Sequence, residues 1–191
     1  MRELRERRGN GARLSLPDPR ADGAPSPGTP PGPGRDGIPA RDDAGVRFPP
    51  PVLYAVPLLA GILLDLRWPL HVLPGAASHV VGAIGVTIGL ALALSALGLF
   101  RRAGTSVIPR RPTTALVTSG PFRLTRNPMY VGLAFVYVGI AFWVNTAWPL
   151  LFFPLVVVLV RRLVIAREER YLEAKFGDAY RRYRRRVRRW L

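Results

Sequence analysis

From residue 128 to residue 160 the chain contains no Asp, Glu, Lys, Arg or His, which leaves few possible folds outside a membrane. A helix needs about 20 apolar residues to cross the hydrocarbon core of a bilayer, so this stretch exceeds one span. It is interrupted by Asn145, Trp148 and Pro149, where Asn and Pro break a helix and Trp favours the membrane interface. We therefore expect two membrane helices joined by a tight turn.

Two further apolar segments precede this pair, at roughly residues 50–64 and 80–100. The second is long enough to span a membrane, whereas the first is short unless residues 68–70 extend it. The pattern predicts an all-α membrane protein with about four transmembrane helices. Gly85 and Gly89 form a GxxxG pair that suits close helix packing, although two unrelated small residues would give the same pattern.

Residues 1–47 are rich in Pro, Gly, Arg and Asp and contain no apolar segment of helix length. Such a composition buries too little apolar surface to offset the entropy lost on ordering. We expect a disordered tail here, followed by one folded domain over residues 48–191. A signal peptide is not expected, because no apolar core lies within the first thirty residues.

Charge placement supports an even number of spans. The loop 101–127 has six arginines and no acids, and residues 161–191 have twelve basic residues and four acids. Four spans put both segments and the tail on one side, which the positive-inside rule makes cytoplasmic. We expect a multi-pass protein with both termini in the cytoplasm. The Arg/Ala/Gly/Pro-rich composition hints at a GC-rich bacterial genome, and hence at a bacterial plasma membrane.

The C-terminal segment 167–191 has helical periodicity but is too polar to cross a bilayer. Its apolar residues recur at spacings of three and four, namely Leu172, Phe176, Tyr180, Tyr183, Val187 and Trp190. Gly177 and Asp178 indicate a helix stop and a new start. The pattern predicts two amphipathic helices at the membrane interface, attracted to anionic lipid headgroups.

Residue counts limit the chemistry. The chain has no cysteine, which excludes disulfides, thiolate metal sites and a cysteine nucleophile. It has two histidines, His71 and His79, so we expect no metal site.

The basic loop ends in a motif that could bind an anion. Asn127 followed by Pro128 is typical of a helix start, which places Arg126 and exposed backbone N–H groups together. Asn127 could also serve only as a helix cap, with Arg126 facing lipid phosphate. After the fourth apolar segment, Glu168 and Glu169 could hold a cationic or hydroxyl-rich ligand. The alternative is a salt-bridged surface turn, with Glu169 paired to a nearby arginine such as Arg162 or Arg170.

Taken in order, these motifs resemble the isoprenylcysteine carboxyl methyltransferases and their relatives, the phospholipid methyltransferases. The resemblance covers about residues 98–191 and rests on Leu116 to Gly120, Arg126-Asn127-Pro128-Met129-Tyr130, Glu168-Glu169 and the run from Phe176 to Tyr183. It implies a methyltransferase that uses S-adenosylmethionine, bound in the half from about residue 101 to residue 191. The methyl acceptor would be lipophilic or small.

The resemblance also implies roles for individual residues. Arg126 and Glu168 would act in catalysis, and the cofactor would contact Thr114, Ala115, Leu116, Val117, Phe122, Asn127, Pro128, Met129, Tyr130, Glu168 and Glu169. Three positions depart from the family pattern. Asn127 replaces a usual His, Phe122 stands where Tyr is common, and Val164 stands where the eukaryotic carboxyl methyltransferases place a substrate-binding Arg. Arg161, Arg162 or Arg167 could replace that last function.

Other functions stay open on the sequence. One is N-methylation of a phospholipid or small amine. Another is a nicotinamide-dependent membrane reductase, although such enzymes usually have more spans. The third is a non-enzymatic protein that binds anionic lipid through the basic run 181–186. We do not expect nucleic acid as a partner, because this run follows a membrane segment closely and favours lipid headgroups.

Overall fold

The computed structural model describes residues 44–46, 49–105 and 113–191, all within the unit Arg41–Leu191. These residues form helices and connections with no strand, which confirms the all-α prediction. The elements are α1 (Pro50–Asp65), α2 (Gly75–Arg102), the 3₁₀ turn η1 (Gly120–Arg123), α3 (Pro128–Trp143), α4 (Trp148–Val160), the π-helical turn η2 (Arg161–Ile165) and α5 (Ala166–Arg186). Most of the predicted tail, residues 1–43 and 47, lies outside the described residues.

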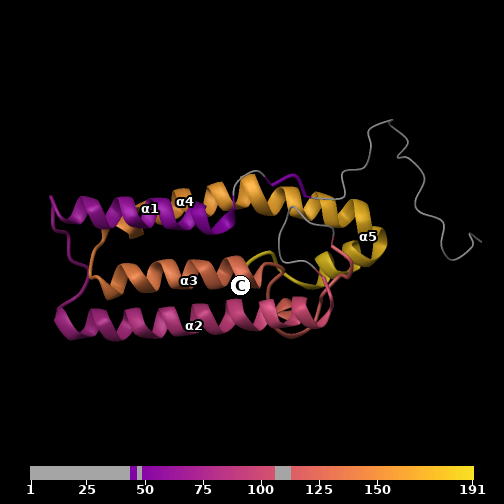
Figure 1. Ribbon diagram of the computed structural model, residues 1–191, viewed down its shortest axis with the longest axis horizontal. Helices are drawn as coiled ribbons and strands as arrows, with labels where there is room; N and C mark the ends of the chain where they lie inside the picture. The colour runs from indigo at the N-terminus through magenta and orange to yellow at the C-terminus, as the bar shows by residue number, and fades with distance from the viewer. Residues whose placement is uncertain (1–43, 47–48, 106–112) are drawn as a thin grey trace, which may run out of the picture. The chain divides into compact units, whose positions relative to one another are not determined.

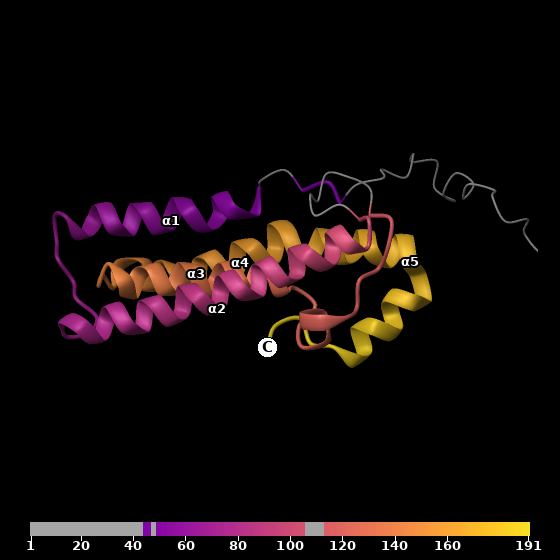
Figure 2. The ribbon, with the colours of Figure 1, turned by 60° about the horizontal axis from the view of Figure 1, so that its bottom comes forward.

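Four of the helices run side by side in two pairs. Helix α1 packs along α4, and α2 packs along α3 (Figures 1 and 2). Helix α3 contacts all three of the others, so its residues reach the centre of the bundle. The core contains Tyr54, Tyr130, Tyr137, Val156, Val160, Val164 and Ile165. One member of this core, Tyr130, lies at the start of α3 and also lines the cavity described below.

Glycines bring α2 and α3 into close backbone contact. A Cβ atom at Gly89 would lie 2.6 Å from the Gly132 carbonyl oxygen, and one at Gly85 would lie 3.0 Å from Gly139 Cα. A side chain at Gly89 would therefore force the helices apart. Gly85 and Gly89 therefore allow the close helix packing that is one of the two interpretations of the GxxxG pair.

The turn between α3 and α4 is as short as predicted. Asn145 adopts a left-handed backbone conformation with φ of 54°. Its side-chain oxygen accepts hydrogen bonds from the Val72 and Leu73 amides, both at 3.1 Å. Its Nδ2 donates to the Leu73 carbonyl at 2.9 Å. One side chain thus joins this turn to the α1–α2 connection.

Two of the described helices are long and apolar enough to cross a membrane, fewer than the four predicted. They are α2 and the continuous helix Trp148–Arg186, which joins α4, η2 and α5. Helices α1 and α3 are apolar but have 16 residues each. At about 1.5 Å per residue such a helix is near 24 Å long, below the roughly 30 Å core of a bilayer. Large apolar side chains on α1 are exposed, including Val56, Leu59 and Leu63, as expected of a lipid-facing surface.

Helix α5 bends at Gly177, where φ is 49° and ψ is −123°. This bend matches the predicted break between two C-terminal helices. Part of the apolar stripe packs inside the protein: Tyr180 is 1% exposed, and the Tyr183 hydroxyl donates to the Phe122 carbonyl at 2.7 Å. The chain therefore folds back to cover this part of the predicted apolar stripe.

Residues 44–46, at the end of the predicted tail, contact the helical bundle. Val46 is 3% exposed and belongs to the core cluster. The Gly45 carbonyl accepts a 2.9 Å hydrogen bond from Arg167 Nη1. Residues 44–46 of the predicted tail therefore pack against the described helices.

Candidate functional site

A cavity of about 390 Å³ lies where α1, α2, α3 and α5 meet the loop before α3. This volume falls within the usual range for small-molecule sites, about 300–1,000 Å³. Its lining includes apolar residues, among them Val46, Pro50, Phe100, Phe122 and Leu133. It also includes residues with polar groups, which are Thr113, Arg126, Asn127, Tyr130, Glu168, Glu169, Tyr171, Tyr180 and Tyr183. The cavity therefore offers both charged and apolar contacts to a ligand.

Nearly all of the site residues expected from the sequence line this cavity. They are Ala115, Leu116, Val117, Phe122, Arg126, Asn127, Pro128, Met129, Tyr130, Glu168 and Glu169. Thr114 is the exception, since its amide donates to Thr105 Oγ1 at 3.0 Å and its hydroxyl to the Gly104 carbonyl at 3.1 Å. It anchors the loop to the end of α2.

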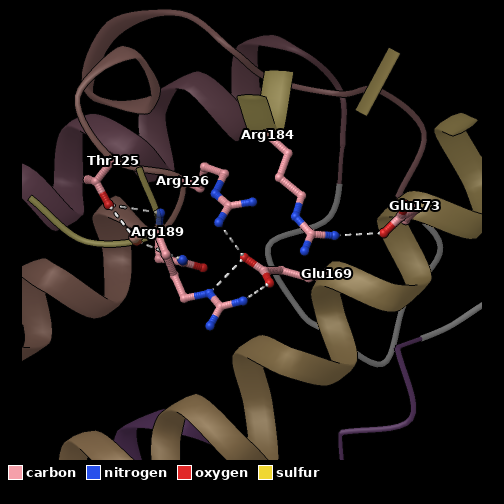
Figure 3. A network of polar contacts seen from close by, with 7 residues as sticks. Thr125, Arg126, Glu169, Glu173, Arg184 and Arg189 are labelled. Carbon is pink, nitrogen blue, oxygen red and sulfur yellow. Dashed lines mark hydrogen bonds and ion pairs between the residues drawn. The ribbon is translucent and has the colours of Figure 1, made fainter. Parts of the chain in front are cut away.

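Glu169 is held between two arginines (Figure 3). Arg126 Nη2 lies 3.2 Å from Glu169 Oε1. From the C-terminal segment, Arg189 Nε donates to Oε1 at 3.1 Å and Nη2 to Oε2 at 2.5 Å. The Glu169 side chain is 9% exposed, so this is a mostly buried, charge-assisted pairing. Neither Arg162 nor Arg170 is its partner, contrary to the alternative drawn from the sequence.

Arg126 has hydrogen-bonding capacity left over. Its side chain is 9% exposed, and its Nε and Nη1 atoms are buried without a well-formed hydrogen bond among the described residues. The Tyr180 hydroxyl lies close enough to interact with this guanidinium but does not satisfy both nitrogens. Buried guanidinium N–H groups without partners are unfavourable, so a native protein normally supplies an acceptor. Two guanidinium groups also face one carboxylate here. The surplus positive charge and these unsatisfied donors together suit an anionic ligand group.

The chain end holds this region in place. The Arg126 amide donates to the Arg188 carbonyl at 2.9 Å, and the Arg189 carbonyl accepts from Thr125 Oγ1 at 2.9 Å and Asn127 Nδ2 at 3.0 Å. Asn127 does occupy the position before α3, but its side chain makes no capping hydrogen bond. Asn127 is thus the N-cap residue by position, but its side chain is used for a different bond, from Nδ2 to the Arg189 carbonyl, and its oxygen caps no backbone N–H.

Glu168 lies in a different environment from Glu169. Its Oε1 accepts a 2.6 Å hydrogen bond from the Tyr130 hydroxyl. Glu168 lies on α5, beyond the apolar part of the preceding helix. Burial raises the pKa of the Glu168 carboxyl to about 7, the Tyr130 hydrogen bond opposes this increase, and the neighbouring Glu169 adds to it. Both carboxylates thus line the cavity, but Glu169 is paired with two arginines, whereas Glu168 has no ionic partner among the described residues and a pKa raised to about 7.

Aromatic side chains close the cavity. Phe100 and Phe122 meet edge to face with centroids 5.2 Å apart, and Tyr180 and Tyr183 do so at 6.3 Å. Burial raises the pKa of Tyr180 to about 12, so this phenol stays neutral at physiological pH. Neutral aromatic faces attract cations through their quadrupoles. The cavity lining thus includes these four aromatic rings, which are of the kind that bind cations in other proteins.

Several of these residues were missed by reasoning from the sequence. Tyr180 and Tyr183 were predicted only as members of the apolar stripe on the C-terminal helix, where their spacing of three places them on one face. Arg189 has no distinguishing signal, because it lies among many arginines near the chain end. Tyr171 and Phe100 have no local signal either.

Arg161, Arg162 and Arg167, the candidates to replace the substrate-binding arginine that is Val164 in this chain, do not line the main cavity. Val164 itself is fully buried in the core. Arg167 bonds to the Gly45 carbonyl, and Arg161 and Arg162 line a separate, smaller cavity. A site of the eukaryotic carboxyl methyltransferase type is therefore not assembled by these residues.

Comparison with known proteins points to one family. A family model described as phospholipid methyltransferase matches residues 77–179, which is more than half of the chain. An uncharacterized protein of Haemophilus influenzae (strain ATCC 51907 / DSM 11121 / KW20 / Rd) is 41% identical over 63 residues, covering 33% of this chain and 100% of that protein. No solved structure matches. The family match spans Arg126, Tyr130, Glu168 and Glu169 but ends before Tyr180 and Arg189.

Proposed function

This chain belongs to the phospholipid methyltransferase family, and from that premise we propose that it is a membrane enzyme that transfers a methyl group from S-adenosylmethionine to a lipophilic or small acceptor. The observation that carries the proposal is the buried Arg126 guanidinium, whose Nε and Nη1 lack a well-formed hydrogen bond within the described residues, beside a cavity of about 390 Å³. The expected four-span, multi-pass topology with cytoplasmic termini is part of the same proposal.

The residues present fit this cofactor group by group. S-adenosylmethionine carries a carboxylate, an ammonium group, ribose hydroxyls and a sulfonium. The Arg126 donors suit the carboxylate, and Glu168 suits the ammonium or the hydroxyls. The faces of Phe122, Tyr180 and Tyr183 suit the sulfonium. Charged groups of both signs thus have a matching partner in one cavity.

The protein's contribution is alignment and exclusion of water. When bound, the cofactor supplies an activated methyl group, so little acid–base machinery is needed. Arg126 is oriented by Glu169, and Glu169 is oriented by Arg189. Phe100, Phe122 and Leu133 keep water from the apolar wall. A lipophilic acceptor would rest against this wall.

One observation favours an amine acceptor, as in N-methylation of a phospholipid or small amine. Glu168 faces the cavity, and burial raises its pKa to about 7. While it holds the cofactor, its carboxylate still contributes negative charge to the cavity, which favours a nearby protonated amine. A carboxylate acceptor would be repelled by the same group.

The test is calorimetric titration of the detergent-purified protein with S-adenosylhomocysteine. We expect binding to the unmodified protein and its loss in the Glu168→Ala variant. Glu173→Ala is the matched control, because Glu173 lies on the same helix, outside the cavity, and pairs with Arg184 at 3.0 Å. Absence of binding by well-folded protein would overturn the proposal. A nicotinamide dinucleotide titration would then test the reductase alternative.

A further inference from the structure

A second, smaller cavity of about 310 Å³ lies at the end of α4 and shares no lining residue with the first. It is lined by Val158, Arg161, Arg162, Ala166 and Arg189. Three of these five residues are arginines, and none carries a carboxylate. Such a lining favours an anion.

The arginines of this cavity have guanidinium groups available. Arg161 and Arg162 are exposed, and no acidic side chain of the described residues pairs with either. The Arg189 guanidinium donates from Nε and Nη2 to Glu169, which leaves Nη1 available to donate to a ligand. Arg161 and Arg162 lie in the π-helical turn η2, a local irregularity that is common at functional sites. Three cationic groups from two distant segments therefore converge on one hollow.

An exposed apolar stripe on α4 leads to the same place. Leu151, Leu155 and Val158 are 61%, 57% and 44% exposed. Their spacing of four and three puts them on one face of the helix, and Arg162 follows Val158 by four residues. The exposed apolar face of α4 thus ends at the second cavity, which is lined by arginines. In a membrane, lipid headgroups lie at this end of an apolar helix.

We propose that Arg161, Arg162 and Arg189 bind the phosphate of one anionic phospholipid, whose acyl chain lies along Leu151, Leu155 and Val158. Arginine pairs with phosphate through charge-assisted, often bidentate hydrogen bonds. The inference requires the membrane position of α4 but not methyl-transfer activity. The lipid is a bound ligand and not the methyl acceptor, since the two cavities share no lining residue. Arg189 connects this site to Glu169, and through it to Arg126.

The test is native mass spectrometry of the full-length protein in neutral detergent, titrated with phosphatidylglycerol or phosphatidylcholine of identical acyl chains. We expect one phosphatidylglycerol to bind roughly tenfold more tightly than phosphatidylcholine. In the Arg161→Gln/Arg162→Gln variant this preference disappears. The Arg161→Lys/Arg162→Lys variant keeps most of it, because the charge is retained.

Arg185→Gln/Arg186→Gln is the matched control, since it removes the same charge from an exposed adjacent pair outside the cavity. It should keep the preference. Equal binding of the two lipids overturns the proposal, as does an unchanged preference in the Arg161→Gln/Arg162→Gln variant. Displacement of the lipid by millimolar inorganic phosphate would show that free phosphate is the ligand, and would also overturn it. The lipid titration is done without S-adenosylhomocysteine, so a failure of this proposal can be distinguished from a failure of the proposed methyl-transfer function.

Discussion

The Tyr130 hydroxyl, at the start of α3, donates a 2.6 Å hydrogen bond to Glu168 Oε1 at the start of α5. The bond crosses the helical hairpin of α3 and α4, so it forms only when the hairpin closes. It favours the charged carboxylate, against the burial that favours the neutral acid. Ligand binding by Glu168 should therefore depend on this tyrosine and on pH.

Tyr130→Phe should shift the pH dependence of S-adenosylhomocysteine binding to higher pH. The variant loses the hydrogen bond that lowers the pKa of Glu168, so a higher pH is needed to form the carboxylate. Calorimetry across pH 6 to 9 measures the shift. Tyr137→Phe is the control, because Tyr137 donates to the Pro149 carbonyl at 2.8 Å, away from Glu168. Identical pH profiles for both variants would count against the role of Tyr130.

Glu168→Gln should stabilise the ligand-free protein at pH 8 while abolishing cofactor binding. Since the pKa of Glu168 rises from 4.5 to about 7 in the folded protein, its contribution to stability falls as pH increases between these values. A neutral amide avoids the unfavourable burial of charge, and we expect a gain of about 1–3 kcal/mol. Thermal unfolding at pH 5 and pH 8 tests this. A variant less stable than the original at pH 8 contradicts the expectation.

Arg189→Ala should weaken both stability and cofactor binding. It leaves Glu169 with Arg126 alone as an ionic partner, and breaking a mostly buried pair costs about 3 kcal/mol. Arg188→Ala is the control, since the Arg188 side chain is exposed and only its backbone carbonyl bonds to Arg126. Arg189→Lys should restore part of the affinity, which a purely structural loss of packing would not predict.

Gly89→Ala should separate α2 from α3. The new Cβ would lie 2.6 Å from the Gly132 carbonyl oxygen, and overpacking of this kind costs about 1–3 kcal/mol. Gly98→Ala, on the same helix, meets nothing within 4 Å and should be neutral or slightly stabilising. Thermal unfolding in detergent compares the two. Equal changes in the melting temperature for the two variants would mean that helix propensity, and not the contact between α2 and α3, determines the stability.

Asn127 offers a test of capping against tertiary hydrogen bonding. As a helix cap, Asn127→Asp should be tolerated, because Asp caps helices as well as Asn does. In the structure Asn127 Nδ2 donates to the Arg189 carbonyl at 3.0 Å, and a carboxylate cannot donate. We therefore expect Asn127→Asp to lose at least as much stability as Asn127→Ala, about 1–2 kcal/mol. Thermal unfolding of both variants decides between the two roles.

The sequence by itself determined the helical content, the short turn at Asn145 and the bend at Gly177. These features depend on local properties: apolar runs, helix breakers and the backbone freedom of glycine. The motifs from Arg126 to Tyr130 and at Glu168 also identified most of the residues that line the cavity. Each of these signals lies within a few residues, where propensity and spacing are informative.

Only the tertiary structure decided which partners these residues have. Arg189, Tyr180 and the Asn127 amide meet the motifs through contacts between distant segments, and nothing local distinguishes Arg189 from its basic neighbours. Glu169 and Glu168 both line the cavity but differ in the partners that distant segments bring to them. Two arginines pair with the first, whereas the second meets the Tyr130 hydroxyl, and burial raises its pKa to about 7. Packing thus assigned different chemistry to two adjacent and identical residues.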